Sequence, residues 1–217
     1  MGGVGPGRPV TVVVFDFDGT LFHLPVDWAA LRHDLGIDER ARIGDLLQRA
    51  MDEGDTATLA VVDEHERAAA RAGEFTPGSP DCLAALRERC RVAVLTRNTR
   101  DAVRIALGRH ADDLLVVGRE DVRRLKPDPE GLHAVLARFG AEPGEAALVG
   151  DTHHDVRAAA AAGARSVVVR NPRLRYAPEG ADHYVDDLTV DLLDVLRRPP
   201  AEFPAPGRSV PSDGPTH

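Results

Sequence analysis

A short stretch near the start of the chain, Thr11 to Phe22 (TVVVFDFDGTLF), constrains the fold more than any other feature. Val12 to Phe15 are apolar without interruption, which is typical of a parallel strand buried on both faces. The strand leads directly into Asp16 and Asp18, and Gly19 then starts a turn whose backbone can approach a ligand closely. We therefore expect a central strand with acidic groups at its carboxyl end.

The spacing of the two aspartates carries chemical information. Side chains two positions apart on an extended segment face the same side, so Asp16 and Asp18 can converge on one site. Their repulsion is relieved by a hard cation such as Mg2+, which prefers oxygen ligands, or by a proton on one carboxyl group, as general acid catalysis requires. Both outcomes indicate a phosphoryl-transfer site. The alternative for a bare pair of aspartates is a polar turn after a strand.

A hydrophobic strand followed by DFDGTLF resembles the first motif of the haloacid dehalogenase-like hydrolases, most of which are phosphatases. The resemblance implies that Asp16 is a nucleophile that forms an aspartyl-phosphate. It also implies that Asp18 protonates the leaving group and then activates water. Dehalogenases, phosphonatases and P-type ATPases carry other residues where this chain has Asp18, so the motif favours a phosphatase or a mutase.

Composition agrees with an enzyme of modest size, because 217 residues, 43% of them hydrophobic, suffice for one core plus a small insertion. The formal charge of −8 has the wrong sign for binding nucleic acid through its phosphates, and 4% aromatic residues offer little base stacking. Residues 1–10 lack the apolar core of a signal peptide, and no run approaches the roughly 20 apolar residues of a membrane span. We expect a cytoplasmic protein with reduced cysteines and neither a nucleic acid nor a membrane as partner.

Residues 24–75 interrupt the alternation of strands and helices with helical patterns alone, and we interpret them as an insertion. In the family that the chain resembles, a helical insertion after the first motif is a mobile cap that closes over the site. We expect Trp28 and the aliphatic residues around it to pack within the cap, and the alternative is that they contact the substrate. The acidic residues of its third helix, 58–72, are expected to form a solvated face: Asp63, Glu64 and Glu66.

The chain then returns to the core pattern. Ser79 is expected to cap a helix, and the strand Val92 to Leu95 ends in Thr96 and Arg97. A hydroxyl and a following backbone N–H at a strand end resemble the second motif of the family, in which the hydroxyl hydrogen-bonds the transferring phosphoryl group. We therefore place Thr96 and Arg97 in the substrate-binding set together with Gly19, and the alternative for Thr96 is a helix cap.

A lysine and two further aspartates complete the motifs. Lys126, held in L-K-P-D-P, resembles the third motif, which implies that its ammonium neutralises charge on the phosphoryl oxygens. The strand Ala146 to Val149 leads into Asp151 and Asp155, which resemble the fourth motif, although Asp155 could instead cap the following helix. The Mg2+ ligands that the resemblance implies are Asp16, Asp18, Asp151 and Asp155.

Two adjacent histidines suggest a competing interpretation. His153, His154 and Asp155 resemble the metal dyad of HD-type phosphohydrolases, which are all-helical. The pair follows one predicted strand and precedes another, residues 166–169, so the architecture does not fit that family. We interpret both histidines as loop residues near the substrate.

Strands that alternate with helices predict an α/β fold with a parallel sheet, and the motif residues fall at the carboxyl ends of strands, where such sheets build sites. The resemblance implies a Rossmann-like core with strand order 5-4-1-2-3. We divide the chain into a flexible start at 1–10, a catalytic core at 11–23 and 76–198, a helical cap at 24–75 and a disordered tail at 199–217.

The function that this pattern favours is that of a Mg2+-dependent phosphatase, similar to phosphoglycolate phosphatases, which acts on a small phosphorylated metabolite through an aspartyl-phosphate. Asp16, Asp18, Thr96 and Lys126 are the catalytic candidates. The alternatives are a phosphomutase of the β-phosphoglucomutase type and a non-catalytic regulatory protein with the same fold.

Overall fold

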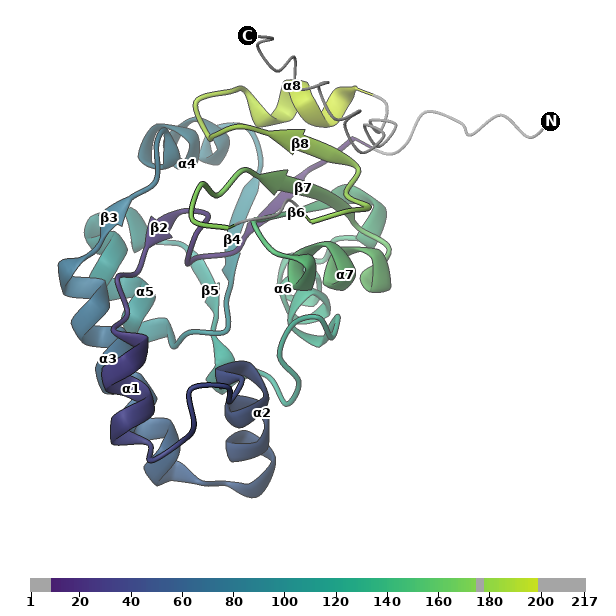
Figure 1. Ribbon diagram of the computed structural model, residues 1–217. Coiled ribbons are helices and arrows are strands. Elements are labelled where there is room, and N and C mark those ends of the chain that lie inside the picture. Colours follow the sequence, from purple (N-terminus) through teal and green to yellow (C-terminus); the bar gives the residue numbers. More distant parts are fainter. Residues whose placement is uncertain (1–8, 175–177, 199–217) are drawn as a thin grey trace, which may run out of the picture.

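The computed structural model describes residues 9–174 and 178–198, and its centre is a six-stranded sheet in the order β5-β4-β1-β6-β7-β8 (Figure 1). All neighbouring strands in it are parallel. The predicted α/β fold and the order 5-4-1-2-3 are confirmed, because β7, β6, β1, β4 and β5 are the fifth, fourth, first, second and third core strands, and β8 extends the sheet beyond β7. The strands are β1 (Val12–Phe15), β4 (Arg91–Leu95), β5 (Leu115–Val117), β6 (Ala146–Gly150), β7 (Arg165–Val169) and β8 (His183–Val185).

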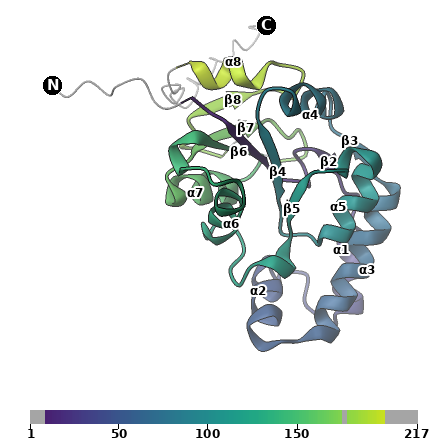
Figure 2. The ribbon, with the colours of Figure 1, turned by 180° about the vertical axis from the view of Figure 1, so that it is seen from behind.

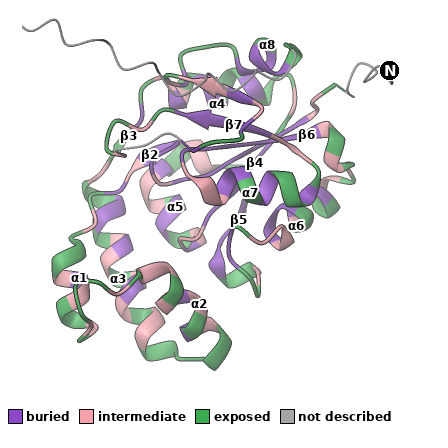
Figure 3. Cartoon of the chain, turned by 45° about the vertical axis from the view of Figure 1, so that its right-hand side comes forward, coloured by how far each residue is buried: buried purple, intermediate pink, exposed green. Residues whose placement is uncertain are grey.

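Helices cover both faces of this sheet, and β1 is buried between them. Val13 and Phe15 belong to one apolar cluster with residues of α4, α5 and α8, whereas Val12 and Val14 belong to a second cluster with residues of α6 and α7. Figure 3 shows the buried strands between helices whose outer faces are exposed. Each fully buried side chain of this kind contributes about 1.5–3 kcal/mol. The helices are α4 (Ser79–Arg87), α5 (Arg100–Leu107), α6 (Glu130–Phe139), α7 (His153–Ala162) and α8 (Leu192–Arg197).

Three helices lie between two short strands, β2 (Phe22–His23) and β3 (Glu74–Phe75), which pair with each other antiparallel. The helices are α1 (Trp28–Asp34), α2 (Ile43–Glu53) and α3 (Thr56–Ala72), and α3 lies beside α5 in Figures 1 and 2.

Residues of the core reach into this helical segment. Leu125, from the loop before Lys126, joins Leu31, Leu47 and Val62 in one apolar cluster. Gln48 of α2 donates to the carbonyl of Arg123 at 2.9 Å and accepts from the amide of Leu125 at 3.0 Å. The three helices are therefore held against the loop that carries Lys126.

Two local expectations are wrong. The N-cap of α4 is Gly78, not Ser79, because the buried Ser79 hydroxyl donates to the carbonyl of Leu21 at 2.7 Å instead of accepting from the helix. Trp28 does not pack inside the helical segment, since it is 46% exposed.

The expectations for the chain ends lie almost wholly outside the described residues. Of the predicted flexible start only residues 9 and 10 are described, and of the predicted tail none. Across the described part of the chain, no helix combines the length and the apolar character that a membrane span requires.

Candidate active site

Three carboxylates meet where β1 and its neighbour β6 end. Asp16 follows β1, Asp151 follows β6, and Asp155 lies in the first turn of α7. Each offers a carboxylate oxygen, and these oxygens all lie within 4.8 Å of one another. All three residues are buried. Pairing of β1 with β6 in parallel register brings these strand ends together.

Lys126 lies against two of these acids. Its ammonium is 2.7 Å from Oδ1 of Asp16 and 2.6 Å from Oδ1 of Asp155, and the side chain is buried. Burial opposes the charge, but the two carboxylates outweigh it, Asp155 more than Asp16, and hold the pKa of Lys126 above its ordinary value. Lys126 therefore stays cationic beside Asp16.

Among the described residues, only one oxygen of the Asp151 carboxylate has a hydrogen-bond donor. Oδ2 accepts from the Asn171 side chain at 2.6 Å, whereas Oδ1 is buried and has no hydrogen-bond donor among the described residues. Burial, followed by the charge of Asp16, raises the pKa of Asp151 to about 8. An unpaired oxygen in a buried cluster of three carboxylates fits a hard divalent cation.

Gly19 lies directly against this carboxylate. Its φ is +84°, and a Cβ atom there would be 2.2 Å from Oδ2 of Asp151 and 2.7 Å from Nδ2 of Asn171. Only glycine allows the turn after Asp18 to approach Asp151 so closely. Asn171 is a site residue that the sequence did not predict, and its place two residues after the end of β7, at the same edge of the sheet, was the available signal.

Asp155 caps the following helix, which was the alternative considered for it, and it also contacts Lys126. Oδ2 accepts from the amide of Thr152 at 3.0 Å and from its hydroxyl at 2.7 Å, which caps α7. Oδ1 accepts from Lys126. Burial opposes its charge, but Lys126 and Thr152 together hold the pKa of Asp155 below its usual value.

Asp18 lies near these acids but outside their cluster. Its Oδ1 accepts from the amide of Leu24 at 2.9 Å. Burial, only partly offset by this hydrogen bond, raises the pKa of Asp18 to about 7. Phe17, between the two aspartates, is fully buried and stacks on Phe22 with ring centroids 5.8 Å apart, so it belongs to the core and not to the site. Asp18 can therefore exchange a proton near neutral pH.

The loop after β4 supplies a second set of groups. The Thr96 hydroxyl donates to Oδ1 of Asn98 and accepts from the Asn98 amide, each at 3.0 Å, so it stabilises its own turn. Arg97 and Asn98 line the cavity in front of the carboxylates. The Arg97 guanidinium reaches Gly44 of α2, where a Cβ atom would be 2.1 Å from Nη2.

A cavity of about 200 Å³ lies between these groups and the three inserted helices. Its carboxylate end contains Asp16, Asp18 and Lys126, and the opposite wall is largely apolar. The remaining lining residues are Val26, Trp28, Leu31, Ile43, Gly44, Leu47, Val62, Glu66, Arg97, Asn98, Thr152 and His154.

The expected solvated face of α3 is wrong for Glu66 and only partly right for Asp63, which is half-buried and pairs with Arg119. Glu66 is 5% exposed, lines the cavity and pairs with Arg119, while Glu64 is exposed as expected. Helical spacing places Glu66 on the same face as the buried Val62 and Ala70, which was the signal available in the sequence.

The two histidines are not loop residues as expected, because they begin α7. Their rings lie 4.1 Å apart, and His154 lines the cavity. Burial, followed by the charge of Arg97, lowers the pKa of His154 to about 4, so its imidazole is neutral at neutral pH. The parallel sheet around them agrees with the rejection of the all-helical family.

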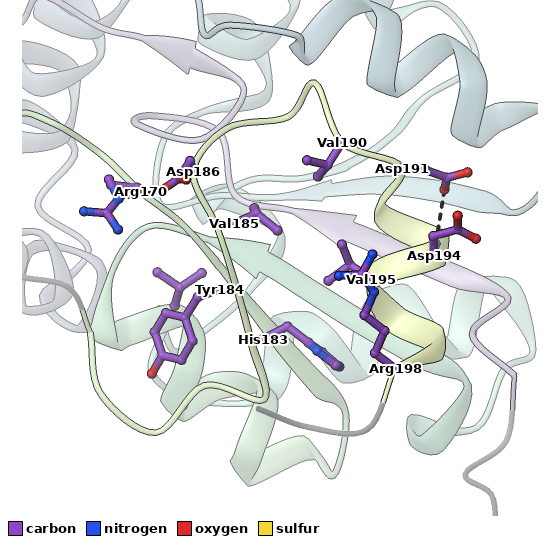
Figure 4. Close-up of a pocket in the computed structure, with 11 residues that line it drawn as sticks. Arg170, His183, Tyr184, Val185, Asp186, Val190, Asp191, Asp194, Val195 and Arg198 are labelled. Atoms are coloured by element: carbon purple, nitrogen blue, oxygen red, sulfur yellow. Dashed lines mark hydrogen bonds and ion pairs between the residues drawn. The ribbon is translucent and has the colours of Figure 1, made fainter. Parts of the chain in front are cut away.

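A larger hollow of about 620 Å³ lies at the far edge of the sheet, against β8 and α8 (Figure 4). Its side chains, among them Arg170, Tyr184 and Asp194, come from the strand β8 and the segments around it. None of the three clustered carboxylates lines it. The cavity at the ends of β1, β4 and β6 is therefore the candidate active site.

The known proteins to which this chain is similar are described as hydrolases or phosphatases. A family model described as haloacid dehalogenase-like hydrolase matches residues 23–163. Phosphoglycolate phosphatase of Rhodospirillum rubrum is 35% identical over 228 aligned positions, which cover 90% of this chain and 92% of that protein. N-acetylmuramic acid 6-phosphate phosphatase of Pseudomonas aeruginosa is 28% identical, with 86% of this chain and 94% of that protein covered. Among solved structures, a hydrolase from Pseudomonas syringae is 25% identical with a TM-score of 0.69, and the match covers 86% of this chain and 97% of that one.

Proposed function

Because the chain belongs to the haloacid dehalogenase-like hydrolases and is a phosphatase, we propose that it hydrolyses a small phosphomonoester through an aspartyl-phosphate on Asp16. The observation that carries the proposal is the placement of the Asp16 carboxylate. It lies at the end of the central strand, touches Lys126, belongs to a cluster of three acids and faces a cavity. The size of that cavity, about 200 Å³, supports a small substrate.

In the first step one carboxylate oxygen of Asp16 attacks phosphorus, and the bond between phosphorus and the ester oxygen breaks. Asp18 gives its proton to the departing oxygen, so an alcohol leaves. In the second step water attacks the phosphorus of the aspartyl-phosphate, Asp18 takes a proton from that water, and the bond from phosphorus to Asp16 breaks. Asp16 is thereby regenerated and inorganic phosphate is released. The pKa of Asp18 near 7 supports both uses of this group.

We assign the Mg2+ ligands to Asp16, Asp151 and Asp155, and we reserve the Asp18 carboxylate for proton transfer, because it lies outside their cluster. Bound Mg2+ would supply positive charge that offsets the acids and polarises a phosphoryl oxygen. Lys126 supplies a second fixed positive charge beside Asp16.

Substrate contacts come from the loops at the same edge of the sheet. Backbone N–H groups around Gly19 and Arg97, together with Thr96, are proposed to hold phosphoryl oxygens. The Arg97 guanidinium lines the cavity beside α2 and offers a positive charge to a second anionic group. This supports a small phosphomonoester that carries a further negative charge, such as phosphoglycolate, the substrate in the name of the Rhodospirillum rubrum relative.

The test is phosphate release from a panel of small-acid, sugar and nucleotide phosphates with Mg2+, using wild type and Asp16→Asn. We expect the highest kcat/KM for a small anionic phosphomonoester and a loss on the order of 10^3-fold or more in Asp16→Asn, because an amide cannot attack phosphorus. Turnover retained by Asp16→Asn would remove Asp16 from the nucleophile role. Turnover that requires a sugar bisphosphate activator and releases little phosphate would indicate a mutase instead.

A further inference from the structure

One buried arginine joins three separate parts of the molecule. Arg119, in the 3-10 turn directly after β5, is 3% exposed. Its Nη1 donates to Oε1 of Glu66 at 2.8 Å and to the backbone carbonyl of Arg97 at 2.9 Å. Its Nη2 donates to Oε2 of Glu66 at 3.0 Å and also to Asp63. We call this set of contacts the Arg119 bridge.

The bridge holds the loop after β4 from two sides. Besides the side-chain bond to the carbonyl of Arg97, the backbone amide of Arg119 donates to the carbonyl of Asn98 at 3.1 Å. Two consecutive carbonyls of one loop are thus held by a single residue. The same loop contains the Thr96 hydroxyl and two residues of the cavity wall.

The other end of the bridge lies on α3. Glu66 is buried, faces the cavity and lies within hydrogen-bonding reach of Asn98. Burying two charges is unfavourable unless good geometry and further hydrogen bonds compensate, so a buried ion pair is by itself a weak argument for stability. Beyond this pair, one bond of Arg119 goes to Asp63 of α3, and two go to the loop of the candidate site, at the carbonyls of Arg97 and Asn98. This arrangement indicates a role in positioning.

We infer that Arg119 is a positioning residue for phosphoryl transfer: it sets the conformation of residues 96–98 and holds Glu66 of α3 at the wall of the cavity. The inference rests on the proposed function, because this loop is the one assigned there to the phosphoryl group. A donor held in place by a buried bridge needs no reorganisation during the reaction, whereas a displacement of about 1 Å can reduce the rate roughly 100-fold.

The chain offers a matched control on the same helix. Arg67 of α3 pairs with Asp101 of α5 at 2.9 Å, so it too joins α3 to the core. Its side chain is 30% exposed, that of Asp101 is 62% exposed, and neither residue lines the cavity. A solvent-exposed ion pair of this kind contributes little to the stability of the fold.

The experiment compares wild type, Arg119→Met, the double variant Glu66→Met/Arg119→Met, and Arg67→Met. The measurements are kcat and KM for p-nitrophenyl phosphate with Mg2+, the thermal midpoint, and hydrogen exchange. We expect Arg119→Met to lower the thermal midpoint and to reduce kcat/KM roughly 10- to 100-fold, mostly through kcat. In the double variant the two buried charges are removed together, so the midpoint should recover while kcat/KM stays at least about 10-fold low. The kcat/KM of Arg67→Met should stay within about twofold of the wild-type value.

Recovery of both stability and kcat/KM in the double variant would overturn the inference, since the bridge would then serve only packing. Hydrogen exchange provides a readout that does not depend on turnover. The amides of residues 97 and 98 should exchange faster in the double variant but not in Arg67→Met, and unchanged exchange would also contradict the inference. Should wild type hydrolyse none of the phosphates, the proposed function fails, while the exchange comparison still decides whether Arg119 holds the loop.

Discussion

Asp16 and Asp18 are two residues apart, yet their surroundings differ. Asp16 touches Lys126, which limits the effect of burial, so its pKa rises only to about 6. Asp18 has an amide of the backbone as its partner, and burial raises its pKa to about 7. The Lys126 ammonium favours the anionic form of Asp16, whereas burial favours the protonated form of Asp18, so the two groups can serve as anionic nucleophile and proton donor at one pH.

The pH dependence of kcat/KM for an alkyl phosphate should reflect these two groups. Asp16 must be deprotonated to attack, so the rate should rise as the pH increases through its pKa, which bound Mg2+ would lower. Asp18 must be protonated to act as acid, so the rate should fall as the pH increases through about 7. A profile measured from pH 5 to 9 checks this. A rate that keeps rising above pH 8 would contradict the assignment of Asp18.

The two uses of Asp18 can be separated with Asp18→Asn and an aryl phosphate. A phenol that is a good leaving group departs without protonation, so Asp16 should still become phosphorylated. Hydrolysis should then stall because an amide cannot activate water. We expect a burst of phenol of up to one per active site and the corresponding added mass after rapid acid quench. A folded Asp18→Asn with neither burst nor added mass would leave Asp18 without its two-step role.

At the scale of elements, the turn after β1 illustrates how backbone geometry serves the site. Gly19→Ala adds a Cβ atom that would lie 2.2 Å from Oδ2 of Asp151, and it also strains a backbone with φ of +84°. We expect a loss of kcat/KM of at least about 10-fold and weaker Mg2+ binding, measured by kinetics and calorimetry.

Gly140→Ala is the matched control, because Gly140, after α6, has φ of +57° and the added Cβ would have no atom of the other described residues within 4 Å. This substitution should lower the free energy of unfolding by about 1 kcal/mol without changing kcat/KM, since it strains the backbone but causes no contact near the site. Equal kinetic effects of the two substitutions would show that the approach of Gly19 to Asp151 is unimportant for activity.

At the scale of the molecule, the cluster of acids links stability to pH and to Mg2+. The pKa of Asp151 is raised from 3.8 to about 8, so its contribution to stability is present below pH 3.8 and is lost as the pH rises through about 8. Mg2+ should therefore stabilise the protein more at pH 8 than at pH 6. At 100 times its Kd a ligand contributes about 2.7 kcal/mol, or roughly 5–10 °C for a chain of this size.

Thermal unfolding with EDTA and with Mg2+ at both pH values measures this effect, and EDTA should also stop turnover. In Asp151→Asn, the increase of the thermal midpoint caused by Mg2+ should fall to a small fraction of the wild-type increase, because the substitution removes the oxygen that has no hydrogen-bond donor among the described residues. Full activity in the presence of EDTA would contradict the metal assignment. So would an increase of the thermal midpoint with Mg2+ that is as large in Asp151→Asn as in wild type.

Local sequence patterns were enough to predict the parallel sheet and the acidic groups at its carboxyl edge. Unbroken apolar runs such as Val12–Phe15 are strands because only a position between two layers of helices can bury both of their faces, and parallel pairing then brings their carboxyl ends together. Asp16 and Asp151 could thus be placed near each other from local patterns. The position of Asp18 outside the cluster could not be predicted from local patterns, because it depends on a hydrogen bond from the backbone amide of Leu24, which follows the turn.

Local patterns did not reveal which polar groups are buried away from those strand ends, because that depends on long-range packing. The helical period of α3 indicates that Glu66 faces inward, but it does not identify the partner of Glu66, since Arg119 lies 53 residues further along the chain. Likewise, Ser79 has the residue type of a cap, yet its hydroxyl pairs with a carbonyl 58 residues earlier. The physical reason is that periodicity records which face of an element turns inward. What a charged or hydroxyl group meets on that face depends on how distant elements pack.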